Sequence, residues 1–119
     1  MTVTPQGTVY LVDLHDLVRV DAAGTVRTIA RNIADDRRSF GSPDRHAVMG
    51  LWTDPGGNVY AAVYADGVVR KFTPQGAMTV VAHSPFPWGP TGGAVAPDGS
   101  LWILEARMPD AVRVRHVRS

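Results

Sequence analysis

The sequence contains no cysteine, which excludes both a disulfide framework and a thiolate metal site. It has no apolar run near the roughly 18 residues of a transmembrane helix, and its first residues do not resemble a signal peptide. Charge is nearly balanced, with 12 Lys and Arg against 11 Asp and Glu. We therefore expect neither nucleic acid nor a membrane as a partner. A small-molecule substrate stays open, and the sequence does not indicate a compartment.

A helical pattern is also absent. The apolar residues fall into short runs rich in Val, Ile, Tyr and Trp, and these runs are separated by the 12 Gly and 9 Pro of the chain. This pattern is typical of short strands joined by turns. With 119 residues, the chain is long enough for one domain with a modest core.

What the chain does contain is a repeat. Three segments share the pattern Pro-x-Gly, a small polar residue, an aliphatic residue and an aromatic residue, followed by an apolar run: 4–13, 54–63 and 96–105. The glycines of this pattern are Gly7, Gly57 and Gly99. Their spacing matches the period of about 40–50 residues of a β-propeller blade, which holds four strands.

The repeat predicts an all-β chain of about 2.75 four-stranded antiparallel blades, part of a six-bladed propeller. With strands named A to D from the centre outwards, blade one (1–30) has strands at 1–4, 8–12, 17–21 and 25–30. A connection (31–47) leads to blade two (48–82), with strands at 48–53, 58–64, 68–73 and 78–82. Blade three (93–117) has strands at 93–96, 100–105 and 111–117 and lacks strand D.

An incomplete set of blades leaves apolar sheet faces uncovered. A propeller closes a ring of about four to eight blades, so that each blade packs between two others. We interpret the chain as the C-terminal part of a longer propeller, whose remaining blades cover these faces. Self-association of identical chains into a ring is the alternative. At the last strand, Arg113 and Arg115 alternate with valines, and charges on an edge strand discourage pairing with other chains. Replacing both with valine is expected to raise aggregation.

The segment 93–105, Gly-Ala-Val-Ala-Pro-Asp-Gly-Ser-Leu-Trp-Ile-Leu-Glu, resembles the repeats of the gluconolactonase/regucalcin (senescence marker protein) superfamily and of NHL-repeat propellers. The segment 49–60 is similar to the same unit, and streptogramin lyases share this blade style. The resemblance implies a metal-dependent hydrolase of small lactones or esters, with one divalent metal (calcium, magnesium or zinc) at the channel mouth. A non-catalytic NHL-like binding or scaffold propeller and a streptogramin-lyase-like enzyme are the alternatives.

The lactonase pattern uses acidic and asparagine ligands from several blades, whereas this chain has only Asn32 and Asn58. A complete metal site is therefore not expected from this chain alone. The candidate metal ligands are Asp13, His15 and Glu105, in loops between strands B and C, because carboxylates and imidazoles suit divalent cations. Alternatively, the first two solvate a hairpin loop and Glu105 is a surface carboxylate.

Two residues are candidates for proton transfer. Glu105 follows an apolar strand and would act as a general base at the channel mouth, unless it is paired with Arg107. His46 precedes an innermost strand and would act as an acid–base group or as a hydrogen-bonded structural histidine. A substrate pocket is predicted from Tyr64, Trp88 and Arg107, because the aromatic, proline-stiffened loop 86–90 would form one apolar wall. Packing of that loop over the blade edge is the alternative.

Overall fold

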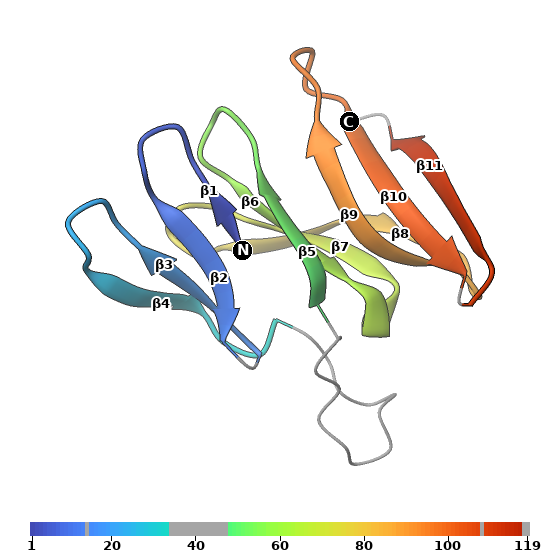
Figure 1. The fold of residues 1–119 in the computed structure, drawn as a ribbon, viewed down its shortest axis with the longest axis horizontal. Coiled ribbons are helices and arrows are strands. Elements are labelled where there is room, and N and C mark those ends of the chain that lie inside the picture. The colour runs from blue at the N-terminus through green and yellow to red at the C-terminus, as the bar shows by residue number, and fades with distance from the viewer. Residues whose placement is uncertain (14, 34–47, 108, 118–119) are drawn as a thin grey trace.

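The computed structural model describes residues 1–13, 15–33, 48–107 and 109–117. Their strands form three antiparallel sheets that stand in a row, with the sheets of blades one and three at its ends (Figure 1). Blade one comprises β1 (Thr2–Val3), β2 (Val9–Asp13), β3 (Asp16–Val20) and β4 (Val26–Ala30). Blade two comprises β5 (Val48–Thr53), β6 (Val59–Val63), β7 (Val68–Phe72) and β8 (Met78–His83). Blade three comprises β9 (Gly89–Val95), β10 (Leu101–Arg107) and β11 (Ala111–Val117). The fold is that of a partial β-propeller, as predicted.

Strand β9 differs from its prediction, because it begins at Gly89 and not at Gly93. A register shift between Leu104 and Glu105 lets β9 continue along β10, where Pro90 pairs with Glu105. The apparent breaker Pro90 is tolerated because β9 has no further strand on its other side in this sheet. A short 3-10 turn, η2 (Tyr64–Asp66), connects β6 to β7. No helix in the described part of the chain is long and apolar enough to cross a membrane.

The Pro-x-Gly segments form the A–B turns. In blade two, Gly57 has φ of 86° and its N–H donates to the carbonyl oxygen of Asp54 at 3.1 Å, which is the left-handed geometry that favours glycine. The Asp54 carboxylate also accepts hydrogen bonds from Asn58 and from the Tyr60 hydroxyl. Burial, together with the bond to Asp54, raises the pKa of Tyr60 to about 12. The repeated glycine is therefore a turn residue, and the A–B turns share one end of the molecule (Figure 1).

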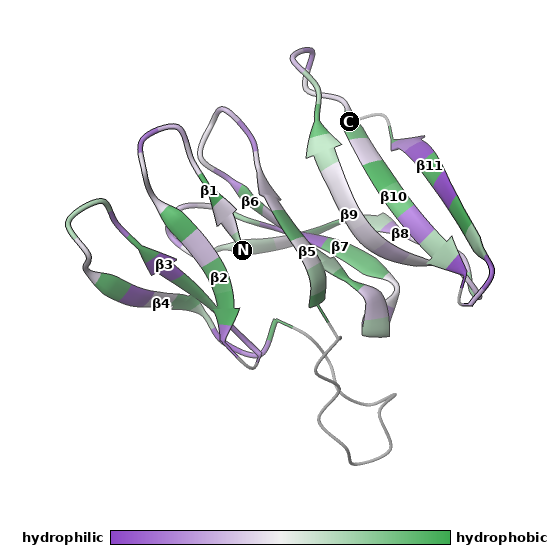
Figure 2. Cartoon of the chain, in the orientation of Figure 1, coloured by the Kyte–Doolittle hydropathy of each residue, from purple (hydrophilic) through white to green (hydrophobic). Residues whose placement is uncertain are grey.

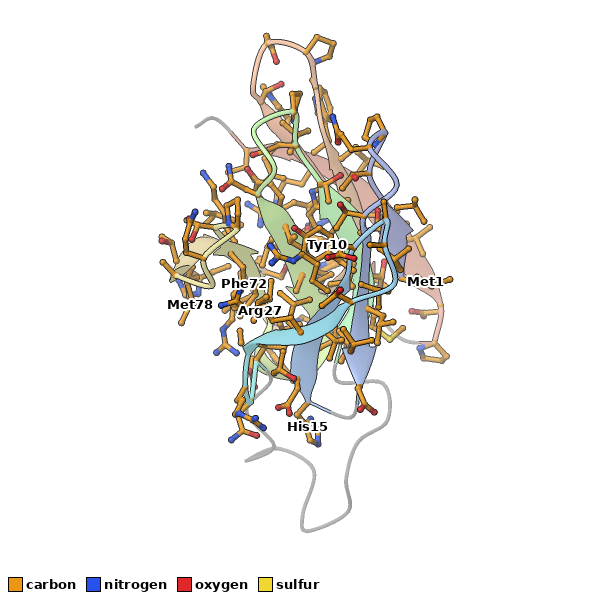
Figure 3. The ribbon with its side chains drawn as sticks, turned by 90° about the vertical axis from the view of Figure 1, so that its left-hand side faces the viewer. Met1, Tyr10, His15, Arg27, Phe72 and Met78 are labelled. Carbon is orange, nitrogen blue, oxygen red and sulfur yellow. The ribbon has the colours of Figure 1, made fainter. Side chains whose placement is uncertain are left out.

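The core lies between the blades. Tyr10 and Leu17 of blade one are buried against Val59, Ala61 and Phe72 of blade two, and Figure 3 shows Tyr10 and Phe72 in the body of the molecule. The second cluster, between blades two and three, comprises Trp52, Tyr60, Ala62, Val69, Ala82, Leu101 and Ile103. All five residues of β6 are buried, as expected for a strand that is covered on both faces.

Candidate functional site

A cavity of about 400 Å³ lies at the end of the molecule opposite the A–B turns. It forms where the β6–β7 loop of blade two meets the connection from β8 to β9. The cavity is lined by Tyr64, Ala65, Asp66, Gly67, His83, Ser84, Phe86, Pro87, Trp88 and Gly89. Its volume falls in the range of about 300–1,000 Å³ that is typical of small-molecule sites. Both segments contribute to the pocket predicted from the sequence, through Tyr64 and the loop 86–90, and we call this end of the molecule the loop face.

Backbone contacts fix the two loops to each other. The N–H of Ser84 donates to the carbonyl oxygen of Gly67 at 2.8 Å. A Cβ at Gly89 would lie 2.6 Å from ring carbons of Tyr64, so the start of β9 packs directly against this ring because residue 89 is glycine. The N–H of Trp88 donates to the Pro85 carbonyl at 2.8 Å and closes the turn between them. The cavity is therefore preformed by the backbone.

Aromatic side chains shape the cavity. Phe86 is 88% exposed, which leaves its ring on the rim without protein packing. The Trp88 ring instead lies beside two guanidinium groups, those of Arg113 at 4.1 Å and Arg107 at 5.5 Å from the ring centroid. Of the predicted pocket residues, Tyr64 and Trp88 line the cavity, whereas Arg107 lies outside its lining and contacts the Trp88 ring. Phe86 thus lies at the cavity, whereas Trp88 of the same loop packs against blade three, and whether the loop forms a binding wall stays a prediction.

Glu105 lies next to Ser84 of the cavity lining and is fully buried. Arg113 Nε donates to Glu105 Oε1 at 2.8 Å, and Arg115 Nε and Nη2 donate to Oε2 at 3.2 and 3.1 Å. The Ser84 hydroxyl donates to the same Oε2 atom. Arg115 also donates to the carbonyl oxygen of His83 at 2.7 Å. The network therefore attaches the β8–β9 connection to blade three.

This arrangement differs from the surface carboxylate paired with Arg107 that the sequence offered as one alternative, because Arg107 pairs with Asp110 at 3.6 Å instead. Burial would raise the pKa of Glu105, but the hydrogen bonds from Ser84, Arg113 and Arg115 outweigh it and hold this pKa below its ordinary value. A carboxylate with both oxygens occupied is a weak base. The geometry favours a positioning role, and the roles of general base and metal ligand stay predictions.

The lowered pKa gives a testable pH dependence. The unfolded chain binds a proton at Glu105 more readily than the folded chain does, so the stabilisation is fully present above the ordinary pKa of 4.5. It is lost as the pH falls through the lower folded-state value. We expect the free energy of unfolding to fall less steeply with acidification in Glu105→Gln than in the original chain. Urea midpoints from neutral pH to about pH 3 measure these slopes, and equal slopes would contradict the network.

The other predicted site residues lie elsewhere. Asp13 is exposed at the end of β2, and His15 follows in the β2–β3 hairpin of blade one, where Figure 3 shows it at the tip. The carbonyl oxygen of His15 accepts a hydrogen bond from the N–H of Ile33 at 2.8 Å. His46 lies outside the described residues. Within the described ranges, no three His, Asp or Glu side chains group as a metal site, so a divalent cation would need further ligands beside Asp13 and His15.

An ion pair that includes the lining residue Asp66 was not predicted from the sequence. Arg70 Nη1 lies 3.4 Å from Asp66 Oδ2, and both side chains are largely buried. Arg70 also donates to the carbonyl oxygen of Ile33. His83 and Ser84 line the cavity and were missed too. Their only sequence signal is their position directly before the aromatic loop 86–90.

No family model matches the chain, and no curated protein matches it. Among solved structures, virginiamycin B lyase from Staphylococcus aureus is similar, with a TM-score of 0.65 and 20% identity over 97% of this chain and 39% of that chain. A catalytically inactive variant of this lyase with quinupristin gives a TM-score of 0.64 at 20% identity over the same shares of the chains. A further streptogramin B lyase structure gives 0.64 at 17% identity, over 94% of this chain and 38% of that one.

These likenesses establish the β-propeller fold. The chain spans about two fifths of the length of these lyases. None of these three structures is a gluconolactonase, so the lactonase resemblance stays a prediction.

Proposed function

We propose that this chain supplies one wall of a small-molecule site in a propeller enzyme of the streptogramin B lyase kind. The observation that carries the proposal is the preformed cavity on the loop face, with the Phe86 ring exposed on its rim. Concave sites with aromatic walls and few polar groups are the usual sites for small organic ligands. The similar structures are lyases, and one of them holds quinupristin.

The residues that line the cavity would make different contributions to ligand binding. Phe86 and Tyr64 offer apolar ring surface to a ligand, and a bound ring would remove the exposed Phe86 from water. His83 adds an imidazole to the wall. Trp88 is held in place by Arg113, which is itself held by Glu105. Binding and orientation of the ligand are the contributions that these residues support.

A second candidate is the metal-dependent hydrolysis of small lactones or esters. The observation that favours it is the pair of possible ligands, Asp13 and His15, in a hairpin at the same end of the molecule as the cavity (Figure 1). Carboxylate and imidazole ligands suit a divalent ion, and further ligands would have to come from outside the described residues. Titration calorimetry with Ca²⁺, Mg²⁺ and Zn²⁺ tests this candidate. It predicts that the original chain binds one of these ions and that Asp13→Ala abolishes the heat of binding.

Replacing Phe86 with alanine is expected to weaken the binding of quinupristin about 10-fold, because roughly 1.4 kcal/mol of ring contact is lost. Calorimetric titration of the original chain and the variant measures the change, and gluconolactone serves as the probe for the second candidate. Met78→Ala is the control, since Met78 is 51% exposed on β8, outside the cavity lining. If quinupristin does not bind the original chain, or if Phe86→Ala binds it equally well, the cavity is not its site.

A further inference from the structure

The polar side chains at the cavity fall into two groups, and those of the first group already have partners in the protein. The Ser84 hydroxyl donates to the Glu105 carboxylate, and the Asp66 carboxylate lies 3.4 Å from Arg70. Polar residues of β11, which alternate with apolar ones in Figure 2, occupy both oxygens of Glu105. Both carboxylates are therefore engaged by arginines.

The second group keeps polar atoms without a protein partner. Within the described ranges, the Tyr64 hydroxyl, the His83 imidazole and the Trp88 indole N–H make no hydrogen bond or ion pair, although all three residues line the cavity. An indole N–H only donates, and a hydroxyl and a neutral imidazole each donate one hydrogen bond as well. The lining thus offers donors beside carboxylates that are already engaged, which suits a ligand that carries acceptor oxygens.

Tyr64 differs from the other two residues because backbone atoms fix its position. The N–H of Gly67 donates to the Tyr64 carbonyl oxygen at 3.1 Å and closes the η2 turn. A Cβ at Gly89 would lie 2.6 Å from ring carbons of Tyr64, so the backbone of β9 packs on the ring. By contrast, His83 is exposed, and the Trp88 ring rests on arginine side chains. The Tyr64 hydroxyl is accessible to water, and a group that is fixed before binding loses less freedom when a ligand binds.

We propose that Tyr64 is a specificity-determining residue of the cavity, whose hydroxyl donates a hydrogen bond to an amide or ester oxygen of an aromatic ligand. The inference rests on the proposed function, since it places the ligand in the same cavity, against the exposed ring of Phe86. A ligand without an acceptor oxygen would displace water from the hydroxyl and leave it unpaired, which weakens binding. A site built to make such a bond selects against analogues that lack the acceptor.

Nuclear magnetic resonance titrations with two probes test this role. N-benzylacetamide has an aromatic ring and an amide oxygen, whereas toluene has the ring alone. Tyr64→Phe is expected to weaken the binding of N-benzylacetamide about 5-fold, the effect of losing one hydrogen bond, and to leave the binding of toluene no weaker. Tyr10→Phe is the matched control, because it removes the same atom from the core between blades one and two, and it should change neither affinity.

Gly89→Ala tests whether the backbone sets the position of the ring. Gly89 has no positive φ, so alanine suits its backbone, and the three atoms nearest to the added methyl group all belong to the Tyr64 ring. Displacement of the ring is expected to weaken the binding of N-benzylacetamide at least about 5-fold. The same substitution made in Tyr64→Ala should cause no further loss. An equal loss in both backgrounds would contradict the positioning of Tyr64 by Gly89.

Phe86→Ala separates this inference from the proposed function. It should weaken the binding of both probes, because each places a ring against Phe86. If it does so and Tyr64→Phe affects both probes alike or neither, the role of Tyr64 is wrong and the proposed function stands. If the original chain does not bind N-benzylacetamide, or if Phe86→Ala leaves its binding unchanged, the inference is overturned as well, and the titration with quinupristin alone decides the proposed function.

Discussion

Replacing Arg113 and Arg115 together with valine is expected to lower the free energy of unfolding by about 3–5 kcal/mol, because it leaves a buried charge without partners. Glu105 is fully buried, and these two arginines supply three of the hydrogen bonds to its carboxylate. The valines add apolar surface, but they cannot solvate the carboxylate. Urea denaturation followed by circular dichroism measures the loss.

The triple variant with Glu105→Leu is the control for this double substitution. Replacing a buried ionic group as a whole by apolar residues is often neutral or stabilising, so the third substitution should restore most of the lost stability. A double variant as stable as the original chain would show that the carboxylate is hydrated. A triple variant as unstable as the double variant would show that the arginines act through packing and not through Glu105.

The structure gives a second reason to expect aggregation of the variant in which Arg113 and Arg115 are both replaced with valine. The sequence analysis placed Arg113 and Arg115 as charges that protect an exposed edge strand. In the structure, their side chains turn to the face toward blade two and bind Glu105. Aggregation of the double variant would therefore follow from partial unfolding as well as from an unprotected edge. Light scattering that rises only together with the loss of β-sheet signal would identify unfolding as the cause.

The strands could be predicted because their limits are local. A Pro-x-Gly turn such as 55–57 fixes where one strand ends and the next begins, and an apolar run such as β6 shows that both of its faces are covered. The start of β9 was missed because Pro90 and three nearby glycines look like a loop in sequence. Pairing with β10 decides its structure, and pairing is not a local property.

The site was harder to predict than the strands. Alternation along β11 shows that Arg113 and Arg115 share one face, but it does not say which face is buried or that Glu105 lies on it. The cavity depends on how two loops meet, through contacts such as Gly67 with Ser84. These segments are separated in sequence by β7 and β8. The sequence therefore indicated the aromatic loop and the end of the molecule at which the cavity lies. The partners of Glu105 and the contact between the two loops depend on how the blades pack, which the sequence does not show.

Gly93 of β9 lies at a close approach between blades two and three. A Cβ at this position would lie 2.6 Å from both the Trp102 carbonyl oxygen and a ring carbon of Trp52. Neither group can move freely, because Trp102 is part of the β9–β10 pairing and Trp52 is buried in the core between the blades. The absence of a side chain at residue 93 therefore lets the two sheets reach their packing distance.

Gly93→Ala is expected to lower the free energy of unfolding by about 1–3 kcal/mol, the usual cost of adding a methyl group to a packed core. The adjacent Gly92 is a matched control in the same strand, since a Cβ there would meet no atom within 4 Å. Gly92→Ala should be neutral or stabilising by up to about 1 kcal/mol, because it reduces the freedom of the unfolded chain. Urea midpoints of the two variants measure the difference. Equal midpoints would mean that blades two and three do not pack through Gly93.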